Sequence, residues 1–312
     1  VNEFKQFVSV ENGVPPSTAI CATTKPEWDC AASKGVFKRT EDCILYSQIV
    51  VTGKLNVTGI PDAQGNLPKI IGGGSNRLFK VESGGELVVK SLNLTGGAPS
   101  EADYYGWGGA VLVFGSFNTI SSFLWGNKGY RGGAILGKNS GSNIQIFNST
   151  ISHNAATYGA GLYAHANSKL YVIDSKIEHN VGYNGGGILC ESAMICNIYD
   201  SFISSNVGTS SSNPAGGLWI ERSSVAVVRD TFIIGNLAPN KAGGDAAFSY
   251  ADIHGTPTIF LLNVDFGNTT NNNLFAGNSG NGINGYCGTR NCSAAPTQCE
   301  DNGYPASYVC AD

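Results

Sequence analysis

The chain has 312 residues, of which 42 are glycine and only 13% are charged, and its formal net charge is −4. It contains no cluster of lysine and arginine, so we expect no nucleic-acid partner. It also contains no run of 18 apolar residues, so we expect no membrane span.

Residues 1–45 are expected to form an N-terminal cap. This part contains Cys21, Cys30 and Cys43, and a strand-like stretch at residues 4–10. The chain begins at Val1 with no apolar leader, which is typical of a processed chain. With nine cysteines in all, the protein is expected in an oxidising compartment, either secreted and extracellular or at the cell surface.

Residues 46–284 are expected to form one parallel β-helix. Early coils are predicted from strand-like runs at residues 47–55, 69–71, 77–81 and 86–94. Regular coils follow over 106–270, where a glycine doublet, a small residue and an aliphatic residue recur. The copies are Gly108-Gly109-Ala110-Val111, Gly132-Gly133-Ala134-Ile135, Gly159-Ala160-Gly161-Leu162, Gly185-Gly186-Gly187-Ile188, Ala215-Gly216-Gly217-Leu218 and Ala242-Gly243-Gly244-Asp245. Their second position advances by 24, 27, 26, 30 and 27 residues, and this period indicates a repeat architecture.

A second signal has the same period, an aliphatic residue followed three positions later by asparagine. The asparagines are Asn127, Asn154, Asn180, Asn206 and Asn236. Short alternating apolar runs lie between the two signals, so each repeat holds two or three strands and no helix. Because like positions stack, the asparagines should form an internal ladder, and the glycines should mark a corner that needs positive φ or close backbone approach. The predicted fold is all-β, a single right-handed parallel β-helix with three sides and disulfide-tied terminal caps.

The cysteines predict where disulfides lie. Cys190 and Cys196 flank a short turn and are expected to pair within one coil. The C-terminal cap, residues 285–312, is expected to be tied by its four cysteines, Cys287, Cys292, Cys299 and Cys310. Zinc is the alternative, but the chain has no Cys-x-x-Cys pair and neither terminal cluster contains histidine. One cysteine is left over, and Cys43 is the expected unpaired residue.

A row of acidic residues precedes the asparagine signal. Asp174, Asp200 and Asp230 occupy equivalent positions in successive repeats, where an earlier repeat has Asn148. Stacked carboxylates repel one another unless a cation is bound, and calcium takes such oxygen ligands. The alternative, which we favour, is a turn row whose side chains bond nearby backbone N–H groups. We therefore expect no cofactor, with calcium as the one candidate.

Aromatic residues gather near the corner that leads into the glycine doublets. The set comprises Tyr104, Tyr105, Trp107, Trp125, Tyr130, Tyr158 and Tyr183. A strip of these rings would suit sugar rings or a protein partner, whereas an internal stack beneath the loops would be structural. His153 and His179 should stack beside Glu178; a solvated surface is the favoured interpretation and acid–base catalysis the alternative.

Five sequons offer N-glycosylation sites, at Asn56, Asn93, Asn148, Asn268 and Asn291. Their number is what chance gives in a chain so rich in asparagine, serine and threonine, so they add nothing to the case for secretion. Asn56 and Asn268 have turn-like contexts and are the best candidates. Asn148 belongs to the acidic row and is expected to be structurally engaged.

The alternation of the two repeat signals over residues 105–245 resembles the repeats of the polymorphic outer-membrane-protein type. This resemblance implies a parallel β-helix, surface exposure, and adhesion or assembly. The chain departs from the bacterial members in its cysteine-rich ends, so membrane autotransport is not expected.

Sequence strings typical of polysaccharide enzymes are missing from the chain. Gly-His-Gly, Arg-x-Lys, Arg-x-Pro-x-x-Arg and Asp-Pro-His do not occur, and the nearest fragment is Asp252-Ile253-His254. We therefore expect a non-catalytic extracellular structural or adhesive protein that binds another copy of itself, another extracellular protein or a glycan. A filament is one form of such an assembly. The alternative is a polysaccharide lyase or hydrolase with an unrecognised site, because a fold alone does not fix a function.

Overall fold

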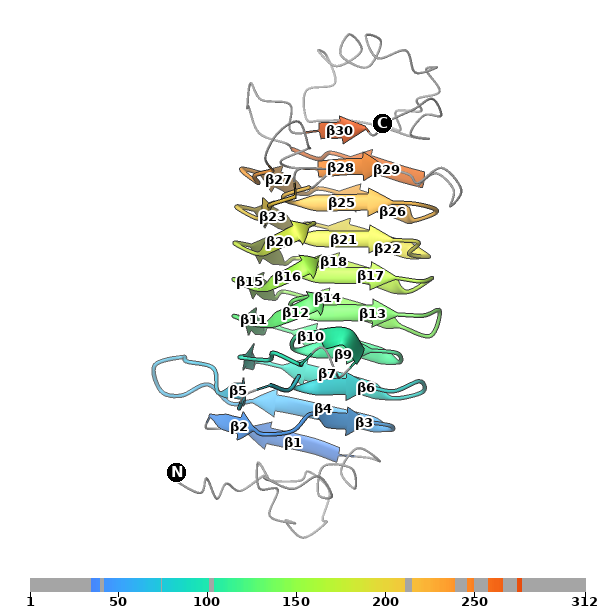
Figure 1. The fold of residues 1–312 in the computed structure, drawn as a ribbon. Coiled ribbons are helices and arrows are strands. Elements are labelled where there is room, and N and C mark those ends of the chain that lie inside the picture. Colours follow the sequence, from blue (N-terminus) through green and yellow to red (C-terminus); the bar gives the residue numbers. More distant parts are fainter. Residues whose placement is uncertain are drawn as a thin grey trace.

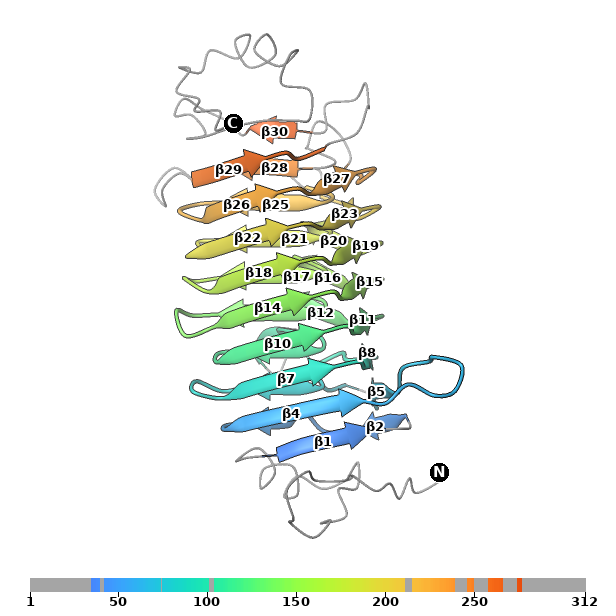
Figure 2. The same ribbon diagram turned by 180° about the vertical axis from the view of Figure 1, so that it is seen from behind.

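The structure is a computed structural model that describes residues 35–39, 42–73, 75–100, 104–210, 215–238, 246–249, 258–265 and 274–276. These residues form successive coils of strands, and the helical element among them is the short 3-10 turn η1 (Tyr104–Gly106). The chain runs from the bottom to the top of Figure 1. The strands nearest the viewer point to the right, and the strands of the far side, seen in Figure 2, run in the opposite direction, which makes the coil right-handed. The predicted right-handed parallel β-helix is confirmed. No helix of the described residues is long and apolar enough to cross a membrane.

Each coil passes first through sheet A and then through sheet B. Sheet A has nine strands: β1 (Gly35–Arg39), β4 (Lys54–Gly59), β7 (Glu86–Lys90), β10 (Ser116–Ile120), β14 (Asn143–Phe147), β18 (Lys169–Ile173), β22 (Ile195–Tyr199), β26 (Val225–Arg229) and β29 (Thr258–Leu262). Sheet B has eight: β2 (Cys43–Leu45), β5 (Lys69–Gly72), β8 (Asn93–Thr95), β11 (Phe123–Trp125), β15 (Thr150–Ser152), β19 (Lys176–Glu178), β23 (Phe202–Ser204) and β27 (Phe232–Ile234).

Sheets C and D complete the coil. Sheet C has nine strands: β3 (Ile49–Val51), β6 (Phe79–Val81), β9 (Val111–Val113), β13 (Ile135–Lys138), β17 (Leu162–His165), β21 (Ile188–Glu191), β25 (Leu218–Glu221), β28 (Ala246–Ser249) and β30 (Leu274–Ala276). Sheet D has four short strands between sheets B and C: β12 (Lys128–Arg131), β16 (Ala155–Tyr158), β20 (Val181–Asn184) and β24 (Val207–Gly208). The central coils thus have four strands rather than the expected two or three, because the chain stays extended after the buried asparagine and pairs with its neighbours.

Alternation along each strand explains how the coils share one core. In β14, Ile144 and Ile146 are buried whereas Asn143, Gln145 and Phe147 are half-exposed. Like positions pair in register from coil to coil, so the inward side chains of neighbouring strands form one continuous apolar stack. A coil cannot bury its apolar side chains alone, and stacking supplies the missing neighbours.

The glycine doublets mark the corner between sheets D and C, as the sequence predicted. Gly132 has a φ of +67°, a left-handed conformation that favours glycine. At Gly133 the requirement is space, because a Cβ would overlap the carbonyl oxygen of Ala160 in the next coil. The two glycines of a doublet are therefore needed for different reasons.

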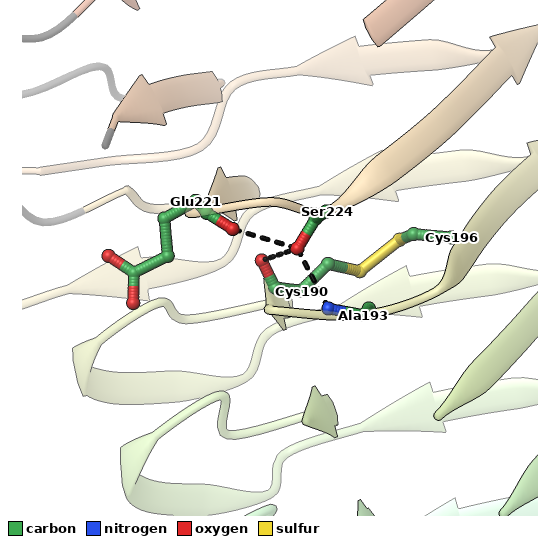
Figure 3. Close-up of a disulfide and its surroundings, with 5 residues drawn as sticks. All are labelled: Cys190, Ala193, Cys196, Glu221 and Ser224. Carbon is green, nitrogen blue, oxygen red and sulfur yellow. Dashed lines mark hydrogen bonds between the residues drawn. A yellow bond between two sulfur atoms is a disulfide. The ribbon is translucent and has the colours of Figure 1, made fainter. Parts of the chain in front are cut away.

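The Cys190–Cys196 disulfide closes the corner between β21 and β22 within one coil, and both cysteines are buried in the core. Figure 3 shows Ser224 of the next coil against this turn. The Ser224 hydroxyl accepts a hydrogen bond from the Ala193 N–H (3.0 Å) and donates one to the Glu221 carbonyl oxygen (2.7 Å). The disulfide and the next coil therefore fix the same turn.

The expectation that Cys43 is unpaired is wrong. Cys43 begins β2, is only 1% exposed, and takes part in a disulfide. In β2 the side chains of Cys43 and Leu45 are buried and Ile44 between them is half-exposed, so the Cys43 side chain faces the inside of the coil. Other predicted features lie outside the described residues. They are the C-terminal cap, residues 285–312, and the terminal cysteines Cys21, Cys30, Cys287, Cys292, Cys299 and Cys310.

Coil stacking begins earlier than the domain boundary that the sequence indicated. Strand β1 starts at Gly35, inside the range 1–45, and pairs in parallel register with β4. Strand β2 pairs with β5 in the same way. The short strands of this first coil carry neither repeat signal, which explains why the period did not reveal them.

Candidate functional surfaces

The five repeat asparagines form a buried ladder between sheets B and D. Asn180 shows the pattern: its Nδ2 donates to the Ile151 carbonyl oxygen and to Asn206 Oδ1, both at 2.9 Å. Its own Oδ1 accepts from the backbone N–H (3.0 Å) and the Nδ2 (2.9 Å) of Asn154. The same bonds link the whole set, Asn127, Asn154, Asn180, Asn206 and Asn236. These side chains are sealed from solvent, so they hold the fold rather than a ligand.

A second ladder, made of serine and threonine hydroxyls, lies at the corner between sheets A and B and was not predicted from the sequence. The backbone N–H of Ser149 donates to the Ser175 hydroxyl (3.1 Å), and that of Ser175 donates to the Ser201 hydroxyl (3.2 Å). Ser122 and Thr231 extend this ladder at its two ends. The signal was available, because a serine or threonine directly follows each member of the acidic row.

The acidic row itself faces solvent at this corner. Asp174 and Asp200 are exposed and have φ of 49° and 50°, a region that Asn and Asp tolerate better than most residues. No described residue donates a hydrogen bond to either carboxylate, so the expected bonds to turn N–H groups are not what selects aspartate here. Asp230 pairs with Arg229 at 3.1 Å. No group of three or more His, Cys, Asp or Glu side chains that could hold a metal ion occurs among the described residues.

The seven aromatic residues do not form one strip. Tyr105 and Trp107 contact each other (ring centroids 5.8 Å apart). Tyr130 and Tyr158 also pair (5.7 Å). Tyr183 is exposed on β20, and Tyr104 begins η1. All of these lie along sheet D or the turn beside it.

Trp125 belongs to a different face. It lies on β11 of sheet B, and its ring lies 6.0 Å from His153. His153 and His179 stack at 5.1 Å, and both rings are exposed. The spacing of aromatic residues along the chain did not reveal that a sheet boundary separates Trp125 from the others.

The outward side of sheet C carries a second, smaller core that the sequence did not predict. Leu136, Tyr163, Leu189 and Trp219 point away from the solenoid interior yet are almost fully buried. Trp107 and Tyr158 pack against them, from η1 and sheet D. The Arg131 guanidinium lies 5.2 to 5.9 Å from the rings of Trp107, Tyr158 and Tyr163. Sheet D therefore covers one outward row of sheet C.

The next outward row of sheet C is an ionisable network. Lys138 Nζ donates to His165 Nδ1 at 2.8 Å, and His165 Nε2 lies 3.8 Å from Glu191 Oε1. Arg222 forms an ion pair with Glu191 Oε1, and the Tyr163 hydroxyl donates to Glu191 Oε2. Both oxygens of the buried Glu191 carboxylate are thus engaged by neighbours within the fold.

Burial dominates the protonation of this network. It lowers the pKa of the His165 imidazole to about 4, so the ring is neutral at pH 7 and its Nδ1 can accept from Lys138. Burial, with the nearby Glu191 charge, raises the pKa of the Glu221 carboxyl to about 7. The same two causes hold the pKa of the Tyr163 hydroxyl far above its usual range, and burial lowers that of Lys138.

The raised pKa of Glu221 predicts a pH-dependent stability. Its folded-state pKa of about 7 lies above the ordinary 4.5, so the folded state binds the extra proton and stability falls as pH rises from 4.5 through 7. Glu221→Gln removes this loss, and the stability of the variant relative to wild type should rise by about 2.5 kcal/mol between pH 5 and pH 8. Urea unfolding at the two pH values measures the gain. His165→Gln should change in the opposite direction, because the lowered pKa of His165 makes the wild type more stable as pH rises from 5 to 8, and the variant lacks this change. An equal gain at both pH values for Glu221→Gln would contradict the prediction.

An open hollow of about 490 Å³ lies on the outward side of sheet B and includes residues of β5. The loop of residues 60–68, which joins β4 to β5, projects from the solenoid beside β5 (Figure 2). It is lined by Lys69, Ile71, Asn93, Thr95, Phe123 and Trp125. Asn93 and Phe123 are register partners on adjacent coils, as are Thr95 and Trp125. The two polar side chains of β8 therefore lie beside the two aromatic side chains of β11.

The sequons have different surroundings. Asn56 lies in the middle of β4, half-exposed on the outward side of sheet A, so its expected turn-like context is wrong. Asn93 lines the hollow, and Asn148 is exposed at the corner with a φ of 42°. Its Nδ2 donates to the Ser121 hydroxyl at 3.1 Å. Asn268 and Asn291 lie outside the described residues.

Comparison of the chain with protein-family models, with curated proteins and with solved structures found no match.

Proposed function

We propose that this protein is a non-catalytic extracellular β-helix that binds a glycan in the hollow on sheet B. The observation that carries the proposal is the exposure of two adjacent aromatic side chains there. Phe123 is 45% exposed and Trp125 is 48% exposed, on a strand whose inward residue, Leu124, is fully buried. Large aromatic rings held open to solvent on a rigid sheet offer flat apolar surfaces, against which the apolar faces of sugar rings stack.

Polar groups of the hollow support the same ligand class. Asn93 and Thr95 are half-exposed in the lining, and their amide and hydroxyl groups can exchange hydrogen bonds with sugar hydroxyls. Lys69 is already paired with Asp42, at 3.7 Å, which reduces the net charge that the hollow presents. An aromatic platform beside an amide and a hydroxyl, with little net charge, fits a neutral sugar better than an anion.

The disulfides support the extracellular part of the proposal. The Cys190–Cys196 bond is buried in the solenoid core, and Cys43, which also takes part in a disulfide, is buried there as well. Disulfides of this structural kind form and persist in oxidising compartments such as the cell exterior.

The proposal predicts that Trp125→Ala weakens glycan binding at least tenfold. A glycan array identifies the ligand, and isothermal titration calorimetry then measures the affinity of the wild type and the variant. Tyr183→Ala is the matched control, because Tyr183 is also 48% exposed but lies on sheet D; it should bind as the wild type does. The protein is freed of N-linked glycans first, since Asn93 is itself in a sequon. An array without any bound glycan, or unchanged binding by Trp125→Ala, would overturn the proposal.

A polysaccharide-active enzyme is the second candidate, and one observation favours it. The Glu221 carboxyl, with its pKa of about 7, is a group that can donate a proton at neutral pH. Release of oligosaccharides from a polysaccharide by the wild type, abolished in Glu221→Gln, would establish this candidate in place of the first.

A further inference from the structure

One of the N-glycosylation sequons lies inside the hollow on sheet B. Its three residues, Asn93, Leu94 and Thr95, make up strand β8. Leu94 is buried in the core, whereas Asn93 and Thr95 are half-exposed on the outward side, and both line the hollow. The Asn-x-Thr acceptor motif is therefore part of the lining itself.

The attachment atom of Asn93 faces the hollow. Its Oδ1 atom is buried although the residue is half-exposed, so the exposed part of the amide is the Nδ2 group, which carries the sugar in an N-linked glycan. Backbone hydrogen bonds fix the strand on both sides. The Asn93 N–H donates to the Pro68 carbonyl oxygen (3.0 Å), and the Phe123 N–H donates to the Leu92 carbonyl oxygen (2.8 Å). A glycan on Asn93 therefore leaves the sheet from a fixed point.

Two exposed aromatic side chains lie within reach of the first sugars of such a glycan. Phe123 is the register partner of Asn93 on the adjacent strand, and adjacent strands lie about 4.8 Å apart. Trp125 is two residues further along that strand, so its backbone is about 8 Å from that of Asn93. A sugar attached to Nδ2 can therefore stack on these rings without any movement of the backbone.

The other sequons in the described part of the chain offer no such surface. The Asn148 Nδ2 already donates to the Ser121 hydroxyl at 3.1 Å. Asn56 lies on β4, where its register partners on the adjacent strands are Val36 and Val88. Among the described sequons, Asn93 is thus the one whose register partner is aromatic.

We propose that Asn93 is N-glycosylated and that this glycan closes the hollow by stacking on Phe123 and Trp125. The inference rests on the proposed function, because it needs a hollow that takes sugar. In the transfer, Asn93 Nδ2 forms a bond to C1 of the sugar and loses a proton, while the bond from C1 to a lipid-linked pyrophosphate donor breaks. The state of Asn93 then regulates the site: the hollow holds its own glycan when Asn93 is modified and is open to an external glycan when it is not.

Covalent attachment makes this contact effective even where the affinity for a single sugar is weak. A ligand on a short tether has an effective concentration in the millimolar range. It also loses less translational freedom on binding than a free sugar does. An external glycan must therefore displace a competitor that cannot diffuse away.

The first test measures modification and access. The full chain is secreted from a eukaryotic cell line, and mass spectrometry of its peptides should find a glycan on Asn93. Ligand-detected NMR then measures binding of free diacetylchitobiose, the two-sugar core of N-linked glycans. Asn93→Gln from the same cells should bind this probe at least tenfold more tightly than the wild type, and the control Asn148→Gln should bind it as the wild type does. An unmodified Asn93, or equal binding by Asn93→Gln and the wild type, would contradict the inference.

A second test reads the contact with the aromatic rings. A peptide N-glycosidase cleaves the bond between Nδ2 and the first sugar, and in the native protein a stacked sugar shields this bond. Phe123→Ala and Trp125→Ala should each speed release from Asn93 at least threefold, whereas Tyr183→Ala on sheet D should leave it unchanged. Such a result supports the inference even if the array finds no external glycan, an outcome that overturns the proposed function alone. Equal release rates in all four proteins would overturn the inference and leave the proposed function standing.

Discussion

Replacing Asn180 by alanine should lower the free energy of unfolding by about 2–6 kcal/mol. The substitution removes the side chain that accepts from Asn154 and donates to Ile151 and Asn206. At least two buried backbone groups, the Asn154 N–H and the Ile151 carbonyl, then lose a partner in the protein interior. Each such group costs about 1–3 kcal/mol because water cannot reach it.

Guanidinium unfolding, followed by circular dichroism, measures this loss. Asn197→Ala is the matched control, since Asn197 faces outward in the middle of β22 and is half-exposed. It should change stability by less than about 0.5 kcal/mol, as surface substitutions usually do. Equal losses in the two variants would mean that the ladder does not hold the coils together.

Gly109→Ala should cost about 3 kcal/mol or more. A Cβ at this position would overlap the carbonyl oxygen of Gly133 and lie 2.6 Å from that of Lys128. Neither carbonyl group can move away, because backbone hydrogen bonds between the coils fix their spacing. One of these runs from the Gly109 N–H to the Gly132 carbonyl oxygen (2.9 Å). The clash is with backbone on two sides, so it cannot be relieved by a side-chain rotation.

The control for this variant separates steric overlap from backbone conformation. Gly84 has a φ of +81° and open space around it, so Gly84→Ala should cost only about 1–2 kcal/mol of left-handed strain. Thermal unfolding of both variants gives the comparison. A smaller loss for Gly109→Ala than for Gly84→Ala would show that close approach between coils is not the constraint.

The sequence predicted the coils well because stacking gives equivalent positions the same role. Asn154, Asn180 and Asn206 must each satisfy the same buried N–H and carbonyl groups, so the same residue returns at the same period. The glycine doublets return because each meets the backbone of the next coil in the same way. Physical requirements that repeat in space become visible as repeats along the chain.

The surfaces were harder to predict, because the contacts of outward residues are not the same in every coil and so do not recur in the sequence. Tyr163 and Glu191 lie on two outward rows of sheet C. Nothing in the repeat pattern indicates that sheet D buries the row of Tyr163 and half-covers the row of Glu191. Trp125 and Trp107 both precede a corner in the sequence, yet the two residues lie on different sheets. The disulfide of Cys43 could not be predicted from the repeat, because Cys43 lies at the end of the solenoid, where the repeat is absent.

The stacking of coils also has a consequence for how the chain reaches its fold. Ladder bonds such as those from Asn154 to Asn180 and from Asn206 to Asn236 join residues only 26 and 30 positions apart. Divided by the length of the chain, these separations give a relative contact order of roughly 0.1, a value more typical of helical bundles than of all-β proteins. Folding therefore needs no search for distant strands. Once one pair of coils has formed, each later coil can dock on the last one, and the solenoid can grow in the order in which the chain is made.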